Sequence, residues 1–299
     1  MISYVFILLT AIVVSGSSSL LGSLLLLRKQ ILLVDAISHA ILPGLVVGYL
    51  ITATKSSSVM IVGATACGFL ATLLIEKLSQ VRTLHADAAM GVVFTVLFSL
   101  GVLLISQPWL NIDLDQDCVL FGEMAYVPFH HLFLGGLDIG PRGLWMAVLV
   151  LGLITVFCYR GRKELPMVLF NPEYARTMGI SVAFWQYGIA FLTAFSTVIH
   201  FELVGSIVVV ALVVIPPSAA FLFAKSFPAL LRLSLCLAII SSMAGFGISW
   251  LVNGSVGGGI ASASFGVFLV CLVIYRMQRK KRSQVHMNNY ATAGAQINM

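Results

Sequence analysis

The sequence predicts an all-α membrane protein, a polytopic bundle of about nine transmembrane helices, with eight to ten as the range. Two features of the composition point to this class: 60% of the residues are hydrophobic and only 9% are charged. A water-soluble domain carries about 25% charged residues, so this chain has too few polar side chains to cover a soluble surface. Apolar runs of about 20 residues, the length that crosses a bilayer, also recur along nearly the whole chain.

Each apolar run is expected to form a helix, because lipid offers no partner to a free backbone N–H or C=O group. The expected spans cover residues 4–27, 31–50, 59–78, 87–106, 144–159, 184–200, 204–224, 233–252 and 260–275. The first span has no basic segment before it and no cleavage site of small residues, which favours a retained helix over a signal peptide. The stretch 184–224 is too long for one span, so we expect a hairpin that turns outside the membrane at His200-Phe201-Glu202.

Positive charge is distributed unevenly between the two sides of this topology. Of the 17 Lys and Arg residues, only Lys55 and Arg142 fall on the less basic side. The positive-inside rule then makes the other side cytoplasmic, with the N-terminus outside and the C-terminus inside. The same asymmetry explains the net charge of +6, so no nucleic-acid partner is indicated. Residues 1–275 form the membrane domain, and the basic, polar tail 276–299 is expected to be disordered.

Asp35 and His39, near the start of the second span, are the first candidates for chemistry. Residues four apart share one face of a helix, so a carboxylate and an imidazole could reach one ion there. Pro43 has no N–H and clashes with the carbonyl of His39, which opens the helix at the same turn. One oxygen and one nitrogen ligand suit Mn²⁺, Fe²⁺ or Zn²⁺ better than Cu⁺. The alternative is an interfacial charge at Asp35 and a buried, hydrogen-bonded His39.

Two external features are weaker candidates. His200 and Glu202, at the expected outer turn, could add ligands or gate a pathway, although a polar turn at the water interface explains them as well. The segment 107–143 is the only long acidic loop, and its apolar part 118–137 could re-enter the membrane or lie along it. It is either a solvated connection or a docking surface for a cation or its carrier protein.

The segment 160–180, expected on the cytoplasmic side, contains a short helix. Asn171 followed by Pro172 is a helix-start pattern, with Asn as the cap and Pro at the first position. Glu173 falls in the first turn, and Gly179 can end the helix. This helix is either an ordinary loop helix or a coupling helix that inserts into a partner. No phosphate-binding P-loop occurs in the sequence, so any ATPase that powers the protein is another chain.

Residues 20–50 closely resemble the signature of the permease subunits of bacterial ABC importers for manganese, zinc and iron. The signature runs from Asp35 to Gly44 as D-A-I-S-H-A-I-L-P-G. Further similar motifs follow in family order: residues 87–94, 120–122, 171–176 and 210–217. They span most of the chain. Two positions depart from the family pattern, Ala86 in place of Glu and Asn171 in place of Asp, and they leave the subgroup and the metal open.

The resemblance implies a type II ABC importer-like fold in the bacterial inner membrane, with this chain as half of a homodimeric or heterodimeric permease. An ABC ATPase would dock through the 171–179 helix, at Pro172, Glu173, Ala175 and Gly179. An extracytoplasmic metal-binding protein would deliver the ion, and Asp35 and His39 would be the metal ligands. The chain would not be an enzyme, and Mn²⁺, Zn²⁺ or Fe²⁺ would be cargo rather than a bound cofactor. An ion-coupled secondary transporter and a membrane scaffold or sensor are the alternatives.

Overall fold

The structure is a computed structural model that describes residues 2–52, 57–81, 85–106, 124, 131–134 and 137–297. Its elements follow in order as α1 (Ile2–Leu27), α2 (Leu33–Ala40), α3 (Leu42–Thr52), α4 (Ser57–Leu78), α5 (Ala86–Ile105), β1 (His131–Leu134), β2 (Leu137–Pro141), α7 (Arg142–Arg160), α8 (Glu164–Phe170), α9 (Pro172–Thr177), α10 (Val182–Val204), α11 (Ser206–Phe221), α12 (Phe227–Val252) and α13 (Val256–Ile297).

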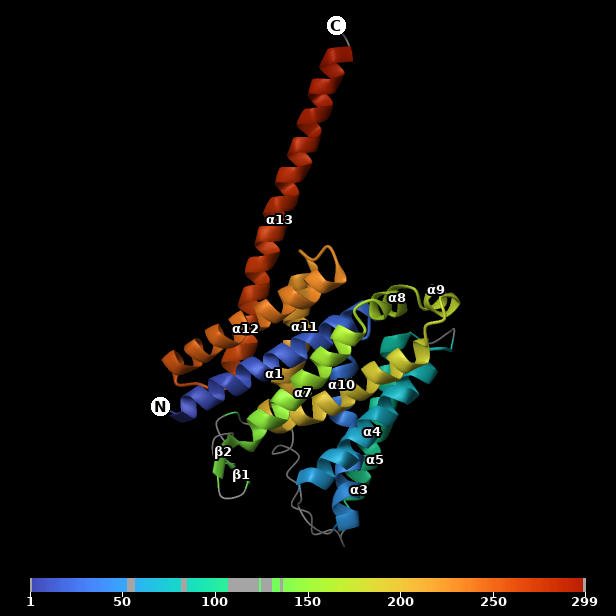
Figure 1. Cartoon of the computed structure of the whole chain (residues 1–299), viewed down its shortest axis with the longest axis vertical. Coiled ribbons are helices and arrows are strands. Elements are labelled where there is room, and N and C mark those ends of the chain that lie inside the picture. Colours follow the sequence, from blue (N-terminus) through green and yellow to red (C-terminus); the bar gives the residue numbers. More distant parts are fainter. Residues whose placement is uncertain are drawn as a thin grey trace.

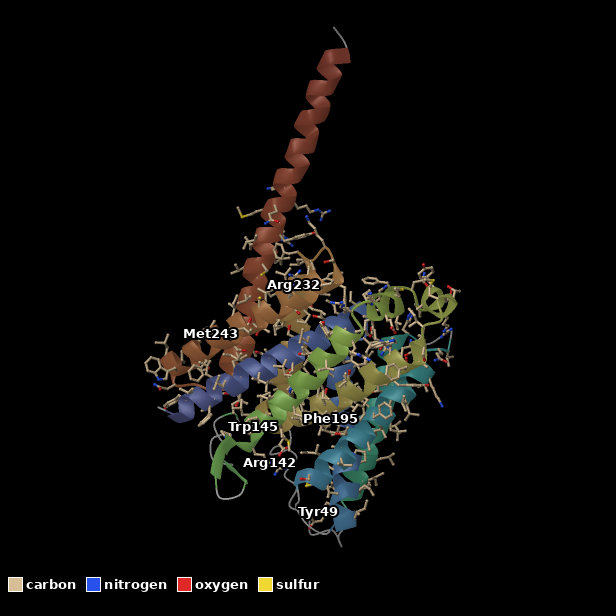
Figure 2. The ribbon with its side chains drawn as sticks, in the orientation of Figure 1. Tyr49, Arg142, Trp145, Phe195, Arg232 and Met243 are labelled. Atoms are coloured by element: carbon tan, nitrogen blue, oxygen red, sulfur yellow. The ribbon has the colours of Figure 1, made fainter. Side chains whose placement is uncertain are left out.

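The predicted membrane bundle is confirmed. Within the described residues, eight helical segments are long and apolar enough to cross a membrane. A ninth apolar helix, Ser206–Phe221, has 16 residues and is therefore about 24 Å long. Large apolar side chains point outward from the bundle, among them Trp145 and Met243, which are 48% and 55% exposed (Figure 2). Such a surface suits a protein whose surroundings are lipid tails.

The helices pack as two groups with α10 between them (Figure 1). Helix α1 packs mainly against α12, α11 and α7, and α13 joins the same set; we call this the α1 group. Helix α4 packs mainly against α3, α5 and α10, and α2 joins it; we call α2 to α5 the α4 group. We call the end of the bundle where α1 and α4 finish, beside Arg28 and Lys77, the basic end.

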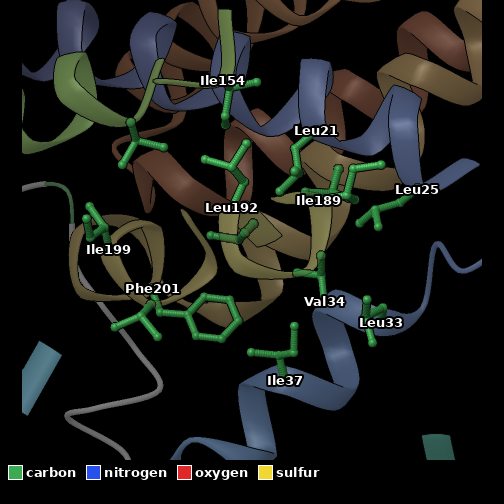
Figure 3. Packing of buried hydrophobic residues seen from close by; sticks show 14 of the residues in the cluster. Leu21, Leu25, Leu33, Val34, Ile37, Ile154, Ile189, Leu192, Ile199 and Phe201 are labelled. Atoms are coloured by element: carbon green, nitrogen blue, oxygen red, sulfur yellow. The ribbon is translucent and has the colours of Figure 1, made fainter. Parts of the chain in front are cut away.

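The hydrophobic core lies where α1, α2, α7 and α10 meet. Figure 3 shows Leu21 of α1, Ile37 of α2 and Ile189 of α10 directed toward one another. All three side chains are at most 1% exposed. Because this core joins the two groups through α10, it fixes the orientation of α2.

The second span is broken, as Pro43 predicted. Helix α2 ends at Ala40 and α3 begins at Leu42, with Ile41 between them. The chain nevertheless continues in one direction as a single apolar segment, Leu33–Ile51.

The predicted turn at residues 200–202 is wrong. Helix α10 continues to Val204, and the turn lies at Gly205, whose φ of 82° and ψ of 159° are accessible almost only to glycine. Gly205 is buried, so the hairpin between α10 and α11 turns inside the protein rather than in an exposed loop. The apolar run 184–224 located the hairpin but not its turn.

The C-terminal tail differs from the sequence analysis, and the segment 107–143 is described only in part. Where a disordered tail was expected from residue 276, α13 continues as a helix to Ile297 and projects away from the bundle (Figure 1). A helix satisfies its own backbone, so it can continue without tertiary contacts. Of the segment 107–143, which was expected to be external, the structure describes buried Met124, an antiparallel hairpin of β1 and β2, and the start of α7. The predicted course of the apolar stretch 118–137 lies largely outside the described residues.

Helices α3 and α4 cross at Gly44 and Gly63, and this contact predicts a specific weakness. A Cβ atom on Gly63 would overlap the carbonyl oxygen of Gly44. We therefore expect Gly63→Ala to lower stability by about 1–3 kcal/mol, the usual result of overpacking, seen as a lower midpoint of thermal unfolding in detergent. Gly152→Ala is the matched control, because nothing lies within 4 Å of its Cβ position. Equal midpoints for the two variants would contradict the close crossing.

Candidate functional site

Asp35 and His39 lie on the face of α2 that points away from the core. Leu33, Val34 and Ile37 are nearly fully buried on the opposite face, against α1 and α10 (Figure 3). Asp35 is exposed and His39 is half-buried. At 100° per residue, the two side chains project within about 40° of each other, so one ion could meet both. A single chain leaves this face uncovered at Asp35.

The ring of His39 rests against α5. Its centroid lies 5.7 Å from that of Phe94 and 5.8 Å from that of Phe98. The two phenyl rings give the imidazole an apolar wall on one side and so restrict its orientation. Asp35 carries no such wall.

Next to His39, the helix break leaves backbone carbonyls without their helical partners. Pro43 has no N–H to donate to the carbonyl of His39. The thiol of Cys67 on α4 donates to the carbonyl of Ala40 at 3.2 Å. The close crossing of Gly44 and Gly63 brings α4 near enough for this contact. Sequence analysis predicted the break but gave no role to Cys67.

Among the described residues, no group of three or more His, Cys, Asp or Glu side chains is arranged to hold a metal ion. At this face, the described residues therefore offer at most the pair Asp35 and His39 to an ion. Carboxylate and imidazole are ligands shared by Mn²⁺, Fe²⁺ and Zn²⁺. A pair of ligands binds an ion less firmly than a closed four-ligand site, which suits transfer rather than storage.

His200 and Glu202 lie in different environments, although only two positions separate them in the sequence. His200 is fully buried inside α10, whereas Glu202 is exposed. The imidazole Nε2 lies 3.0 Å from Ser17 Oγ, and Nδ1 lies 3.0 Å from Ser18 Oγ and 3.3 Å from Ser196 Oγ. A metal ligand needs a free ring nitrogen, and both nitrogens of His200 are engaged here.

The hydrogen bonds around His200 also assign its proton. Ser17 Oγ lies 2.9 Å and 3.0 Å from the carbonyls of Val13 and Val14, so its single proton goes to one of them. Ser17 must then accept from Nε2–H. Full burial disfavours the charged ring, so Nδ1 carries no proton and accepts from Ser18. His200 is therefore a neutral imidazole that joins α10 to α1. The sequence analysis did not identify the serines of α1 as partners of His200.

The predicted helix at 171–179 is present as α9. The side chain of Asn171 accepts a hydrogen bond from the backbone N–H of Tyr174 at 3.0 Å, with Pro172 at the first position. Gly179 follows the helix with a φ of 76°. Pro172, Glu173 and Gly179 are exposed, but Ala175 is fully buried. Ala175 can therefore seat the helix on the bundle but cannot touch a partner directly.

Exposed apolar side chains around α9 were missed by the sequence analysis. Phe170, Tyr174 and Met178 are 68%, 53% and 59% exposed, and their spacing of four residues was the available signal. Unlike the apolar side chains of the spans, they belong to a connection at the basic end. A bond of 2.7 Å from Trp185 Nε1 to Glu164 Oε2 fixes α8 to α10 beneath them.

Comparisons with known proteins identify what this fold is similar to. The model of the ABC 3 transport family matches residues 3–275. The manganese transport system membrane protein MntD of Bacillus subtilis is 37% identical over 259 residues, which cover 86% of each chain. The zinc transport system membrane protein TroD of Treponema pallidum is 34% identical over 270 residues, or 90% of this chain and 73% of that protein. The structure of PsaBC from Streptococcus pneumoniae in complex with Fab has a TM-score of 0.70 and 26% identity, and covers 89% of each chain.

The buried His200 cluster predicts a loss of stability on substitution. His200→Ala removes two hydrogen bonds worth about 1 kcal/mol each and leaves a cavity, so we expect a loss of at least about 2 kcal/mol. The readout is the midpoint of thermal unfolding in detergent. His85→Ala, at an exposed position before α5, is the matched control and should leave the midpoint unchanged. A wild-type midpoint for His200→Ala would mean that α1 and α10 are held by apolar packing alone.

Proposed function

The chain belongs to the ABC 3 transport family, and from that premise we propose that it is the permease subunit of an importer that moves a divalent transition-metal ion into the cytoplasm. The observation that carries the proposal is the outward face of α2, with Asp35 and His39 beside the break at Ile41. Ionisable side chains at membrane depth are costly and mark ion pathways. The freed carbonyls at the break add oxygen atoms of the kind that line such pathways.

A second permease subunit completes this pathway. Asp35 is exposed on a single chain, and lipid is a poor neighbour for a carboxylate. Two copies, or this chain and a related one, that face each other through α2 would bring two carboxylates and two imidazoles together. Four such ligands suit Mn²⁺, Zn²⁺ or Fe²⁺, and two of the relatives are named as manganese and zinc transport proteins.

Energy comes from a separate ATPase that docks on α9. The sequence contains no phosphate-binding P-loop of its own. Phe170, Tyr174 and Met178 offer an apolar contact, while exposed Glu173 and Arg176 supply charges around it. Movement of α9 would reach the bundle through Ala175 and through the bond between Glu164 and Trp185.

The positive-inside rule orients the chain in the bacterial inner membrane. The basic end faces the cytoplasm, where the ATPase is, which puts the N-terminus outside and the C-terminus inside. A metal-binding protein outside the membrane would deliver the ion at the opposite end, where β1 and β2 of the segment 107–143 lie. The acidic residues Asp113, Asp115, Asp117 and Glu123 fall outside the described residues.

Transport by the α2 pair can be tested in proteoliposomes that contain this chain, its ATPase and its binding protein. Asp35→Ala and His39→Ala should each lower ATP-dependent metal uptake by at least about tenfold, since each removes a ligand from the pathway. His85→Ala, which changes an exposed imidazole, should transport at the wild-type rate. Radioactive Mn²⁺ and Zn²⁺ report the preferred ion.

Three outcomes of that experiment separate the proposals. Wild-type rates for both α2 variants would remove Asp35 and His39 from the pathway. Uptake that needs an ion gradient instead of ATP would identify a secondary transporter. No uptake of any divalent metal by the complete complex would overturn the proposed function.

ATPase docking on α9 predicts a separate defect. The double variant Tyr174→Ala/Met178→Ala should weaken binding of the ATPase by at least about tenfold, because exposed aromatic and apolar anchors carry most of an interface's affinity. Co-purification in detergent measures the effect. The control is the double variant Val148→Ala/Leu149→Ala on the outer face of α7. The side chains of these two residues are 41% and 53% exposed. Equal recovery of the ATPase with both variants would place its docking surface elsewhere.

A further inference from the structure

The α1 group and the α4 group are joined at the basic end by one ion pair. Arg28 Nη2 lies 2.8 Å from Glu76 Oε1, and the two side chains are 10% and 18% exposed. Arg28 follows the last residue of α1, and Glu76 lies in the last turn of α4. Apart from this pair, α1 and α4 hardly touch in the described part of the chain.

The ion pair is incompletely compensated. Arg28 Nη1 and Glu76 Oε2 are buried and find no hydrogen-bond partner among the described residues. A buried charged group with an unmet hydrogen bond loses hydration without replacing it, so the net stabilisation from such a pair is small. The contact therefore closes the two groups together without holding them firmly.

Arg28 also lies on the connection that leads to α2, which carries Asp35 and His39. Helix α1 ends in a Schellman motif: Gln30 N–H donates to Leu25 at 3.0 Å, and Lys29 N–H donates to Leu26 at 3.0 Å. Lys29 takes the left-handed conformation, with a φ of 57°, which is strained for a residue with a side chain. Helix α2 starts at Leu33, so Asp35 follows Arg28 by only seven residues.

The His200 cluster provides a contrast within the same molecule. It joins α10 to α1, deeper in the bundle, through neutral groups in which both ring nitrogens have partners. A fully satisfied buried cluster rigidifies its surroundings. The contact between α1 and α10 is therefore suited to stay closed while the ends of α1 and α4 separate.

We propose that Arg28 and Glu76 form a latch at the basic end, closed in this structure, whose opening lets the α1 group separate from the α4 group that carries α2 and releases the metal ion. This inference rests on the proposed transport function. When the two groups separate, the carboxylate of Glu76 is freed and the connection from α1 to α2 loses its tie to α4, while α2 stays packed on α4 and α5. When they close, the guanidinium neutralises that carboxylate again and keeps it from retaining the departing cation.

The test locks the latch with a disulfide in the assembled transporter. The variant Arg28→Cys/Glu76→Cys is oxidised with diamide, washed, and compared with the same sample after reduction. Ser23→Cys/Ser234→Cys is the matched control, because its two hydroxyl oxygens lie 2.9 Å apart between α1 and α12, inside one helix group. Wild-type chain treated in the same way reports any effect of the five native cysteines.

We expect oxidation of the latch variant to lower metal uptake by at least about tenfold, with recovery on reduction, while the control pair keeps its uptake. Uptake that is unchanged by a complete cross-link between residues 28 and 76 would overturn the latch. Failure of the reduced variant and of the wild-type chain to transport at all would instead count against the proposed function.

A second readout distinguishes a moving latch from a static tie. The rate of disulfide formation between residues 28 and 76 should change by at least about threefold when the ATPase is given a non-hydrolysable ATP analogue. The Ser23/Ser234 control pair should show the same rate in both states. If residues 28 and 76 form the disulfide at the same rate with and without the nucleotide, the ion pair only stabilises the fold.

Discussion

The fold depends on one constraint: in a membrane, every backbone N–H and C=O group must find a partner inside the protein. Continuous helices meet it automatically, and most of this chain is built from them. The second span does not, because Pro43 cannot donate to His39 and the helix stops at Ile41. This break is sustainable because the opposite face of α2 is locked in the core. The thiol of Cys67 donates a hydrogen bond to the neighbouring carbonyl of Ala40.

Small residues make that contact possible. Helices in lipid gain no hydrophobic advantage from association, so they associate through close backbone contact. Gly44 and Gly63 let α3 and α4 approach until a side-chain atom would no longer fit between them. The same closeness puts the Cys67 thiol within reach of Ala40. A break that would be unstable in an isolated helix thereby becomes a fixed feature beside the metal-binding candidates.

Much of this fold could be predicted from sequence, because the requirements of the bilayer are local. Run length gave the spans, Pro43 gave the break, and Asn171-Pro172 gave α9, since each acts within a few residues. The turn at Gly205 was misplaced because the polar side chains of His200 and Glu202 interrupt the apolar run 184–224, whereas the chain turns at a buried glycine just beyond them. The environment of His200 depends on serines about 180 residues away, so no local pattern could show that both ring nitrogens are occupied.

The distribution of polar groups separates what is fixed from what can move. The hydroxyl groups of Ser17 and Ser18 and the imidazole of His200 lie inside the bundle with their hydrogen bonds made, so they stabilise one arrangement of α1 and α10. Charged groups lie where the packing is thinnest: Asp35 on an uncovered face, and Arg28 with Glu76 between two groups of helices. Charge is costly in a low-dielectric interior unless it is paired. In the proposed transport cycle, each of these charged positions gains a partner that it can also lose, which is the property that ion transfer requires.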